Sequence, residues 1–370
     1  TGVVAISSVS GGSATEDGAQ SVTITITENE TAPVVNLSVS SSSITENSGS
    51  SITVTATMNF ATIIDTNITI STSGTALEGT DYGNVADITI SAGDTTGTAT
   101  FTPTDDAVYE GNETATITMA SITGADAGST TSQTITITEN ESTPVVTLAT
   151  SASSIAENAG SSLTLTATLS VATTADVTVA LSTSGTGTEG TDYAAISDIT
   201  ILAGQLTGTA SFTPTDDSIY DATSNETATI AISGVSGGSA TESGDQSVTI
   251  TITDNESAPT VTLSRSASAI DENSASTVTI TATLSVVTFQ DVTVSIDGTG
   301  GTGTEGTDFG AVSDITISAG STTGTAVLDP TDDSIYEGDE TAGISISGVS
   351  GGGASESGSQ SVTVTITENE

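Results

Sequence analysis

Acidic residues gather at the same point of a segment that occurs three times in the chain. The segment reads TDDAVYEGNE at 104–113, TDDSIYDATSNE at 215–226 and TDDSIYEGDE at 331–340. Each copy contains an Asp pair and a third acid four residues after the second Asp. Carboxylates grouped in this way can bind a cation, or they can act as acid and base in the hydrolysis of a glycoside.

The chain has almost no positive charge to balance these acids. Its 370 residues contain 46 Asp and Glu and a single basic residue, Arg265, which gives a formal net charge of -45. Two carboxylates about 4 Å apart repel each other by roughly 4 kcal/mol at an effective dielectric constant near 20. Since Lys and Arg cannot neutralise such clusters here, protons, solvent screening or metal ions must do so.

Composition argues against several classes of function. Nucleic acids and anionic membrane surfaces repel so acidic a chain. The absence of Cys and His leaves no thiol nucleophile and no zinc-thiolate site. Only a carboxylate pair could perform catalysis, and three copies of one site in series are unusual for an enzyme, so we expect none. No apolar run approaches the roughly 18 residues of a membrane span, and the chain does not begin as a signal peptide does.

The available ligands favour calcium over other metal ions. A set of oxygen ligands without imidazole or thiolate suits a hard cation, and a cluster of six to eight flexible oxygens suits calcium better than magnesium. We therefore interpret the acid clusters as calcium sites. An acidic strand end that is merely screened by solvent is the alternative.

The acids belong to repeats of about 110 residues. SITENSGSSITVTAT at 43–57 returns at 154–168 and 269–283, and EGTDYGNVADITISAG at 78–93 returns at 189–204 and 305–320. Each repeat closes with TITITENE, TITITDNE or TVTITENE. These motifs divide the chain into repeat 1 at 31–141, repeat 2 at 142–256 and repeat 3 at 257–370, each the size of a domain.

Apolar and polar residues alternate in seven short segments of repeat 1, which predicts seven strands and no helix. Ile52, Val54, Ala56 and Met58 share one face, while the Thr residues between them face the other way. The prediction is an all-β fold of tandem antiparallel immunoglobulin-like sandwiches in an elongated array. Six aromatic residues are predicted to pack the cores and loops: Tyr82, Tyr109, Tyr193, Tyr220, Phe309 and Tyr336.

Residues 1–30 form a partial repeat. They are identical to residues 227–256 at 23 of 30 positions, which makes them the last hairpin of a sandwich. A lone hairpin is marginally stable in water, so it needs the rest of a sandwich. We expect that the hairpin belongs to a preceding domain of a longer array; donation to a neighbouring molecule is the alternative.

The ordered motifs ENxG, GTxxEGTDY, DITISAG, PTDD(A/S)(V/I)YEGxE and TITITENE resemble those of the Calx-beta domain. This resemblance implies an immunoglobulin-like sandwich, and in calcium-binding members the ions lie between loops at one end of the sandwich. The closing ENE or DNE departs from the run of Asp that is common in the family. In repeat 2, Asp221 replaces a Glu and the step to the next Glu is two residues longer, so we expect this repeat to bind calcium least well.

Carried over by motif, the resemblance implies seven calcium ligands in each repeat. In repeat 1 they are Glu46, Asp81, Asp105, Asp106, Glu110, Glu139 and Glu141. In repeat 2 they are Glu157, Asp192, Asp216, Asp217, Asp221, Asp254 and Glu256. In repeat 3 they are Glu272, Asp308, Asp332, Asp333, Glu337, Glu368 and Glu370.

These observations favour a structural protein of the cell surface, with a bacterial origin expected from the resemblance. Calcium would stiffen a string of sandwiches that forms the stalk of an adhesin or the body of a filament. The expected partners are neighbouring repeats of the same or an identical chain, including a homopolymer, because sheet edges can pair. A module that binds carbohydrate or protein is the alternative, and a calcium-sensing regulatory domain is a minor one.

Overall fold

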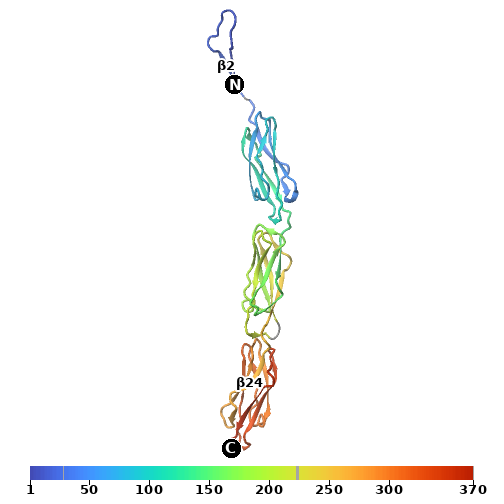
Figure 1. The fold of residues 1–370 in the computed structure, drawn as a ribbon, viewed down its shortest axis with the longest axis vertical. Helices are drawn as coiled ribbons and strands as arrows, with labels where there is room; N and C mark the ends of the chain where they lie inside the picture. Colours follow the sequence, from blue (N-terminus) through green and yellow to red (C-terminus); the bar gives the residue numbers. More distant parts are fainter. Residues whose placement is uncertain (28, 222–224, 370) are drawn as a thin grey trace. The chain divides into compact units, whose positions relative to one another are not determined.

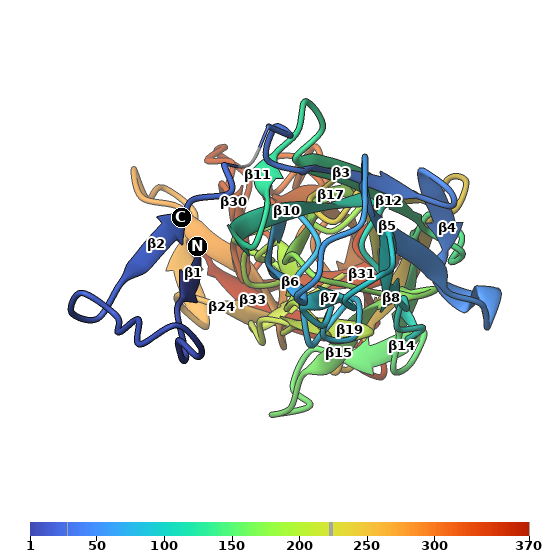
Figure 2. The same cartoon turned by 90° about the horizontal axis from the view of Figure 1, so that it is seen from above.

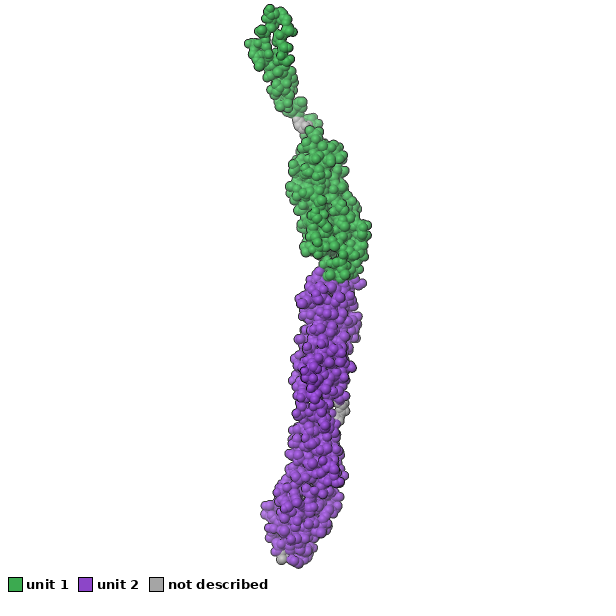
Figure 3. Space-filling model, in the orientation of Figure 1, with its two compact units in different colours: residues 1–141 green, residues 142–370 purple. Residues whose placement is uncertain are grey.

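Strands pack in two layers in each of the three repeats. The computed structural model describes residues 1–27, 29–221 and 225–369, shown as a ribbon in Figure 1. Two compact units make up the chain, Thr1–Glu141 and Ser142–Glu370, and Figure 3 colours them separately. In the described residues no helix is long and apolar enough to cross a membrane.

Repeat 1 is a sandwich of a five-stranded and a four-stranded sheet. The larger sheet has the order β4 (Ser43–Thr45), β12 (Ser132–Thr138), β10 (Glu113–Thr123), β6 (Thr66–Gly74) and β7 (Ile88–Ile90). The smaller has the order β11 (Asp126–Ala127), β3 (Val34–Val39), β5 (Ile52–Met58) and β8 (Thr96–Phe101). A 3-10 turn, Glu46–Ser48, follows β4, and the short strand β9 (Val108–Tyr109) lies in the acidic loop.

Repeat 2 has the same two sheets. Its five-stranded sheet consists of β14 (Ser154–Ala156), β23 (Ser247–Thr253), β21 (Glu226–Ser236), β17 (Val177–Gly185) and β18 (Ile199–Ile201). Its four-stranded sheet consists of β19 (Thr207–Phe212), β15 (Leu163–Leu169), β13 (Val145–Thr150) and β22 (Thr241–Glu242). The short strands β16 (Ala172–Thr173) and β20 (Ile219–Tyr220) lie in its loops.

Repeat 3 repeats this order. The larger sheet consists of β25 (Ala269–Asp271), β33 (Ser361–Thr367), β31 (Glu340–Ser350), β28 (Val292–Gly301) and β29 (Ile315–Ile317). The smaller consists of β30 (Thr323–Leu328), β26 (Val278–Leu284), β24 (Thr260–Arg265) and β32 (Ser355–Glu356). One short strand, β27 (Val287–Thr288), pairs in parallel with β20 of repeat 2, so these two repeats meet within one unit.

The predicted all-β sandwich is confirmed, and all seven predicted strands of repeat 1 are present. Three strands were not predicted, β4, β9 and β11, because two or three residues are too few for an alternating pattern. Two of these strands, β4 and β11, form the edges of the two sheets. β4 pairs in parallel with β12 and β11 in parallel with β3, so the sandwich is antiparallel except at these edges.

The core follows the alternation in the sequence. Ile52, Val54, Ala56 and Met58 are all buried, as predicted. An aromatic pair fills the centre of repeats 1 and 2, with ring centroids 4.7 Å apart for Tyr82 and Phe101, and 5.0 Å apart for the equivalent pair of repeat 2. Burial of such large side chains stabilises a sandwich built mostly of Val, Ile, Ala and Thr.

The hairpin of residues 1–30 has the geometry of the hairpin that ends repeat 2. β1 (Gly2–Ala5) and β2 (Ser21–Ile24) run side by side in Figure 2. Gly2 pairs with Ile24, as the equivalent Ala228 pairs with Ile250. The apolar side chains of the hairpin face solvent: Ile24 is 53% exposed, whereas Ile250 is fully buried. Its assignment as a partial repeat stays a prediction, which this shared register supports.

The same substitution in these two hairpins should have different effects. Ile250→Ala leaves a cavity in a packed core and should lower the free energy of unfolding of repeat 2 by about 2–5 kcal/mol. Ile24→Ala removes an exposed side chain and should change stability by less than about 0.5 kcal/mol. Urea unfolding of the full chain followed by circular dichroism measures both. Equal losses would contradict the exposure of the first hairpin.

Candidate calcium site

Hydrogen bonds within the protein hold the acidic loops of repeat 1 together. The amide of Thr104, just before the Asp pair, donates to the carbonyl of Asp81 over 2.9 Å. The Asp81 carboxylate accepts from the amide of Leu77 at 2.6 Å, which closes the EGTDY turn. The same two contacts recur in repeats 2 and 3 with the equivalent residues, so the motifs GTDY and PTDD are neighbours in every sandwich.

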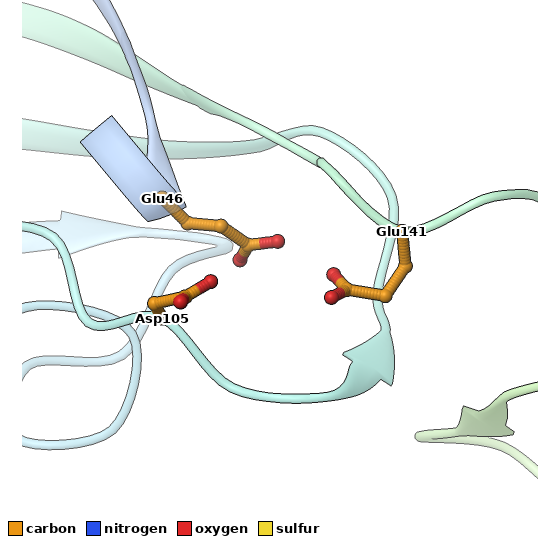
Figure 4. Close-up of side chains that lie close together, drawn as sticks. All are labelled: Glu46, Asp105 and Glu141. Atoms are coloured by element: carbon orange, nitrogen blue, oxygen red, sulfur yellow. The ribbon is translucent and has the colours of Figure 1, made fainter.

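A first carboxylate cluster contains Glu46, Asp105 and Glu141, each of which offers an oxygen within 4.8 Å of the other two. Figure 4 shows the three side chains pointing toward one another from the turn after β4, the loop after β8 and the segment after β12. Glu46 is only 8% exposed, and Glu141 Oε2 is buried without a hydrogen-bond partner in the described part of the chain. An acceptor buried without a donor is costly unless it faces a cation.

A second cluster lies beside the first and contains Asp81, Glu110 and Glu113, again with oxygens within 4.8 Å of one another. Glu113 is the first residue of β10 and is half-buried. Glu113 is not among the ligands predicted from the sequence. The sequence did contain a sign that Glu113 belongs to the site, because a Glu ends all three copies of the acidic segment, at Glu113, Glu226 and Glu340.

Glu139 joins the last strand to the acidic loop. Its Oε2 accepts from the amides of Glu110 at 2.6 Å and Gly111 at 2.8 Å, and its Oε1 accepts from the amides of Asn140 and Glu141, both at 2.9 Å. Burial opposes ionisation, but hydrogen bonds from Glu141 and from these amides lower the pKa of Glu139 to about 2. An ionised Glu139 therefore fixes the loop that carries the other acids.

The neighbours of Glu139 hold their protons unusually tightly. Burial, together with a hydrogen bond to Glu139, raises the pKa of Glu46 to about 8. Burial and the charge of Asp81 raise the pKa of Glu113 to about 7. Without a cation, the clusters thus keep protons near neutral pH, and a bound cation would replace these protons.

Repeat 2 has one cluster, which differs from the first cluster of repeat 1 because Asp254, the equivalent of Glu139, takes the place of the equivalent of Asp105. Glu157, Asp254 and Glu256 lie within 4.8 Å of one another, and Glu256 Oε2 is buried without a partner in the described residues, as Glu141 Oε2 is. Within the same described range, Asp192, Asp221 and Glu226 do not meet this distance, although their equivalents in the other repeats do. The shorter Asp221 side chain and the altered loop are the differences in sequence here.

In repeat 3 the second cluster is present, with Asp308, Glu337 and Glu340 within 4.8 Å of one another. Glu272 accepts from the amide of Asp333 at 3.2 Å, and Glu368 accepts from the amides of Glu337 and Gly338, as Glu139 does in repeat 1. The predicted ligand Glu370 lies outside the described residues.

The second Asp of each pair has a local structural role. Asp106 accepts from the amide of Val108 at 2.7 Å, and Asp217 and Asp333 accept in the same way from Ile219 and Ile335. This bond closes a turn of the Asx type and directs the following loop. Asp106, Asp217 and Asp333 are in none of the groups whose oxygens lie within 4.8 Å, and neither are Asp216 and Asp332.

The metal-free protein should lose stability as the pH rises from 5 to 8. Glu46 and Glu113 have pKa values of about 8 and about 7 when folded and an ordinary value of 4.5 when unfolded, so the folded state binds more protons over this range. Thermal melts in chelator at pH 5.5 and pH 8 measure the loss. Glu113→Gln should flatten the dependence, and a melting temperature that rises with pH would contradict it. Calcium should reduce the dependence, because the ion replaces the protons.

Comparison with known proteins identifies the family of this chain. The Calx-beta domain model matches residues 28–141, 139–256 and 254–370. Among solved structures, CBD12 from CALX1.2 is 14% identical, with 59% of this chain and 99% of that chain covered and a TM-score of 0.28. Invasin, a bacterial integrin-binding protein, is 17% identical, with 90% and 60% covered and a TM-score of 0.31. Comparison with curated proteins found no match. Because the three family matches together span residues 28–370, the chain belongs to the Calx-beta domain family.

Proposed function

We propose that this chain is an extracellular structural protein whose sandwiches bind calcium at the carboxylate clusters and are stiffened by it, as the stalk of a surface adhesin or the body of a filament. One observation carries the proposal: Glu141, whose Oε2 is buried without a donor in the described residues, offers an oxygen within 4.8 Å of Glu46 and Asp105, in a chain with one basic residue. A cation satisfies this oxygen and removes the repulsion between the three carboxylates.

The donor set suits calcium. Both clusters of repeat 1 offer carboxylate oxygens alone, from Glu46, Asp105 and Glu141 in one and from Asp81, Glu110 and Glu113 in the other. Carboxylates from different loops can supply the six to eight ligands of calcium, whereas magnesium requires a nearly ideal octahedron and retains its waters. Affinities of extracellular calcium modules commonly lie in the range of about 10⁻⁴ to 10⁻³ M.

The stiffening role follows from the position of the acidic loop. In repeat 2, β20 lies between Asp217 and Asp221, and this same strand pairs with β27 of repeat 3. The amide of Asp221 also donates to the Asp254 carboxylate at 2.8 Å, so the loop is tied to a residue of the carboxylate cluster of repeat 2. An ion that fixes the cluster fixes the segment that holds the next repeat, which limits bending between repeats.

Calcium should raise the melting temperature of the full chain. At a tenfold excess over the dissociation constant, each ion adds about 1.4 kcal/mol to the free energy of unfolding of its repeat, which is roughly 5 °C for a domain of this size. Calorimetric titration and melts with calcium or magnesium measure the effect. The double variant Glu46→Gln with Glu141→Gln should lose it in repeat 1, while Asp94→Asn, an exposed acid outside the clusters, should behave like the unchanged chain. No calcium uptake at 10 mM would overturn the proposal.

Repeat 2 should require the highest calcium concentration. Its second group of acids, Asp192, Asp221 and Glu226, is spread more widely than the groups of repeats 1 and 3. Hydrogen exchange followed by mass spectrometry, at increasing calcium, should show protection of segments 104–110 and 331–337 before segment 215–221. Protection of the three segments at one concentration would show that the longer loop does not weaken binding.

A further inference from the structure

Two neighbouring strands of the four-stranded sheet of repeat 1 present Thr at every outward position of their pairing. We call this surface the Thr face. It consists of Thr53, Thr55 and Thr57 on β5 and of Thr96, Thr98 and Thr100 on β8. The two strands pair in a register that places Thr directly opposite Thr, with Thr55 and Thr98 at the centre. The residues between them on β5, such as Val54, are buried in the core, which fixes the outward direction of the Thr residues.

Repeats 2 and 3 have the same face. Their strands β15 and β26 each carry three outward Thr residues, which are Thr164, Thr166 and Thr168 in repeat 2 and Thr279, Thr281 and Thr283 in repeat 3. On the paired strands β19 and β30, two of the three outward residues are Thr, and the third is Ser211 or Val327. The central pairs are again Thr with Thr, at Thr166 and Thr209 and at Thr281 and Thr325.

The Thr faces carry no acid, although the chain is strongly acidic. None of its 46 Asp and Glu residues lies in β5, β8 or the equivalent strands of repeats 2 and 3. Aromatic side chains do not lie on these faces either, since Phe101 and its equivalent Phe212 point inward and are fully buried. A face of this composition suits a neutral partner that forms hydrogen bonds, and it lacks the aromatic rings on which sugars stack.

The hydroxyls of the Thr face are available to a partner. In the described residues none of the six hydroxyls of this face in repeat 1 has a hydrogen bond to another protein group. Thr residues on the outer side of the five-stranded sheet differ: the hydroxyls of Thr116 and Thr134 bond each other at 3.0 Å, as do those of Thr229 and Thr249. Each free hydroxyl offers one donor and two acceptor positions to the solvent.

The sheet sets a regular spacing for these hydroxyls. Residues two apart on one strand are about 6.6–6.8 Å apart, and neighbouring strands are about 4.8 Å apart. Both distances are close to the repeats of the water oxygens on a prism face of hexagonal ice. Neighbouring strands are rotated by about 20–25° against each other, so such a match holds over only a few strands, and the Thr face uses two.

The Thr side chains are also held in place before binding. Thr is β-branched, so its χ1 angle has few alternatives, and little entropy is lost when its hydroxyl becomes ordered. The inward neighbours Ile52, Val54 and Ala56 are buried and anchor β5 to the core. The methyl groups lie between the hydroxyls and exclude loosely ordered water from the face.

We propose that the Thr faces bind ice. The hydroxyls take the places of water oxygens in the surface layer of the crystal, and the methyl groups fit the spaces between them. The partner is neutral and offers donors and acceptors at a regular spacing, as the face does. This activity is separate from calcium binding, because no residue of the carboxylate clusters lies on β5, β8 or the equivalent strands.

Uptake of the full chain into slowly growing ice, in buffer with calcium, tests the proposal. The chain should enter the ice in excess over serum albumin and should inhibit the recrystallisation of ice in sucrose. The triple variant Thr55→Tyr, Thr166→Tyr and Thr281→Tyr places a large ring at the centre of each face. It should raise the concentration needed for inhibition at least tenfold. The double variant Glu46→Gln with Glu141→Gln should still enter ice, which separates this activity from calcium binding.

A matched control places the same three rings on the other sheet. Thr134→Tyr, Thr249→Tyr and Thr363→Tyr alter exposed residues of β12, β23 and β33 and should leave ice uptake unchanged. Both triple variants should melt as the unchanged chain does, because Tyr suits exposed strand positions, and circular dichroism measures this. No uptake of the unchanged chain, equal losses in the two triple variants, or binding to crystalline cellulose without uptake into ice would overturn the proposal.

Discussion

Repulsion between carboxylates that no basic residue neutralises is the constraint on which this structure depends. Glu46, Asp105 and Glu141 lie within 4.8 Å of one another at the end of a sandwich, and Asp81, Glu110 and Glu113 do so beside them. In the absence of a cation the cluster keeps protons: burial, together with a hydrogen bond to Glu139, raises the pKa of Glu46 to about 8. A bound cation and protons would be alternatives at this place, and the pH response of the cluster is linked to folding.

The stability of the sheets offsets the repulsion between these carboxylates. Each acid is placed by an element whose stability comes from the apolar core: Glu113 begins β10, which contributes Ala115 and Ile117 to the core, and Glu139 follows β12. Backbone amides then fix Glu139 in its ionised form, so one acid of the group is a structural residue and holds the loop that carries Glu110. The sandwich thus supplies both the driving force for folding and the geometry of the site.

Much of the fold could be predicted because alternation is a strong signal over six or more residues. Ile52, Val54, Ala56 and Met58 were assigned to the core from their spacing alone, and they are buried. The edge strand β4 was missed, because three residues show no period and its parallel partner β12 is distant in sequence. The grouping of acids into two clusters could not be predicted either, since it depends on where a half-buried residue such as Glu113 points from its strand.

Tyr220 and Tyr336 show what a single repeat cannot reveal. Both stand in the sequence SIY after an Asp pair, and both follow a turn closed by the second Asp. Tyr220 is partly buried and paired, whereas Tyr336 is 74% exposed. The prediction that Tyr336 packs a loop is wrong. In repeat 2 the strand pair with β27 covers this position, since Tyr220 pairs with Thr288. Burial of Tyr220 is therefore a property of the junction, and in repeat 2 the acidic loop both carries carboxylates such as Asp221 and offers β20 to repeat 3. Because one loop does both, an ion that ordered this loop would act on the junction without any intervening element.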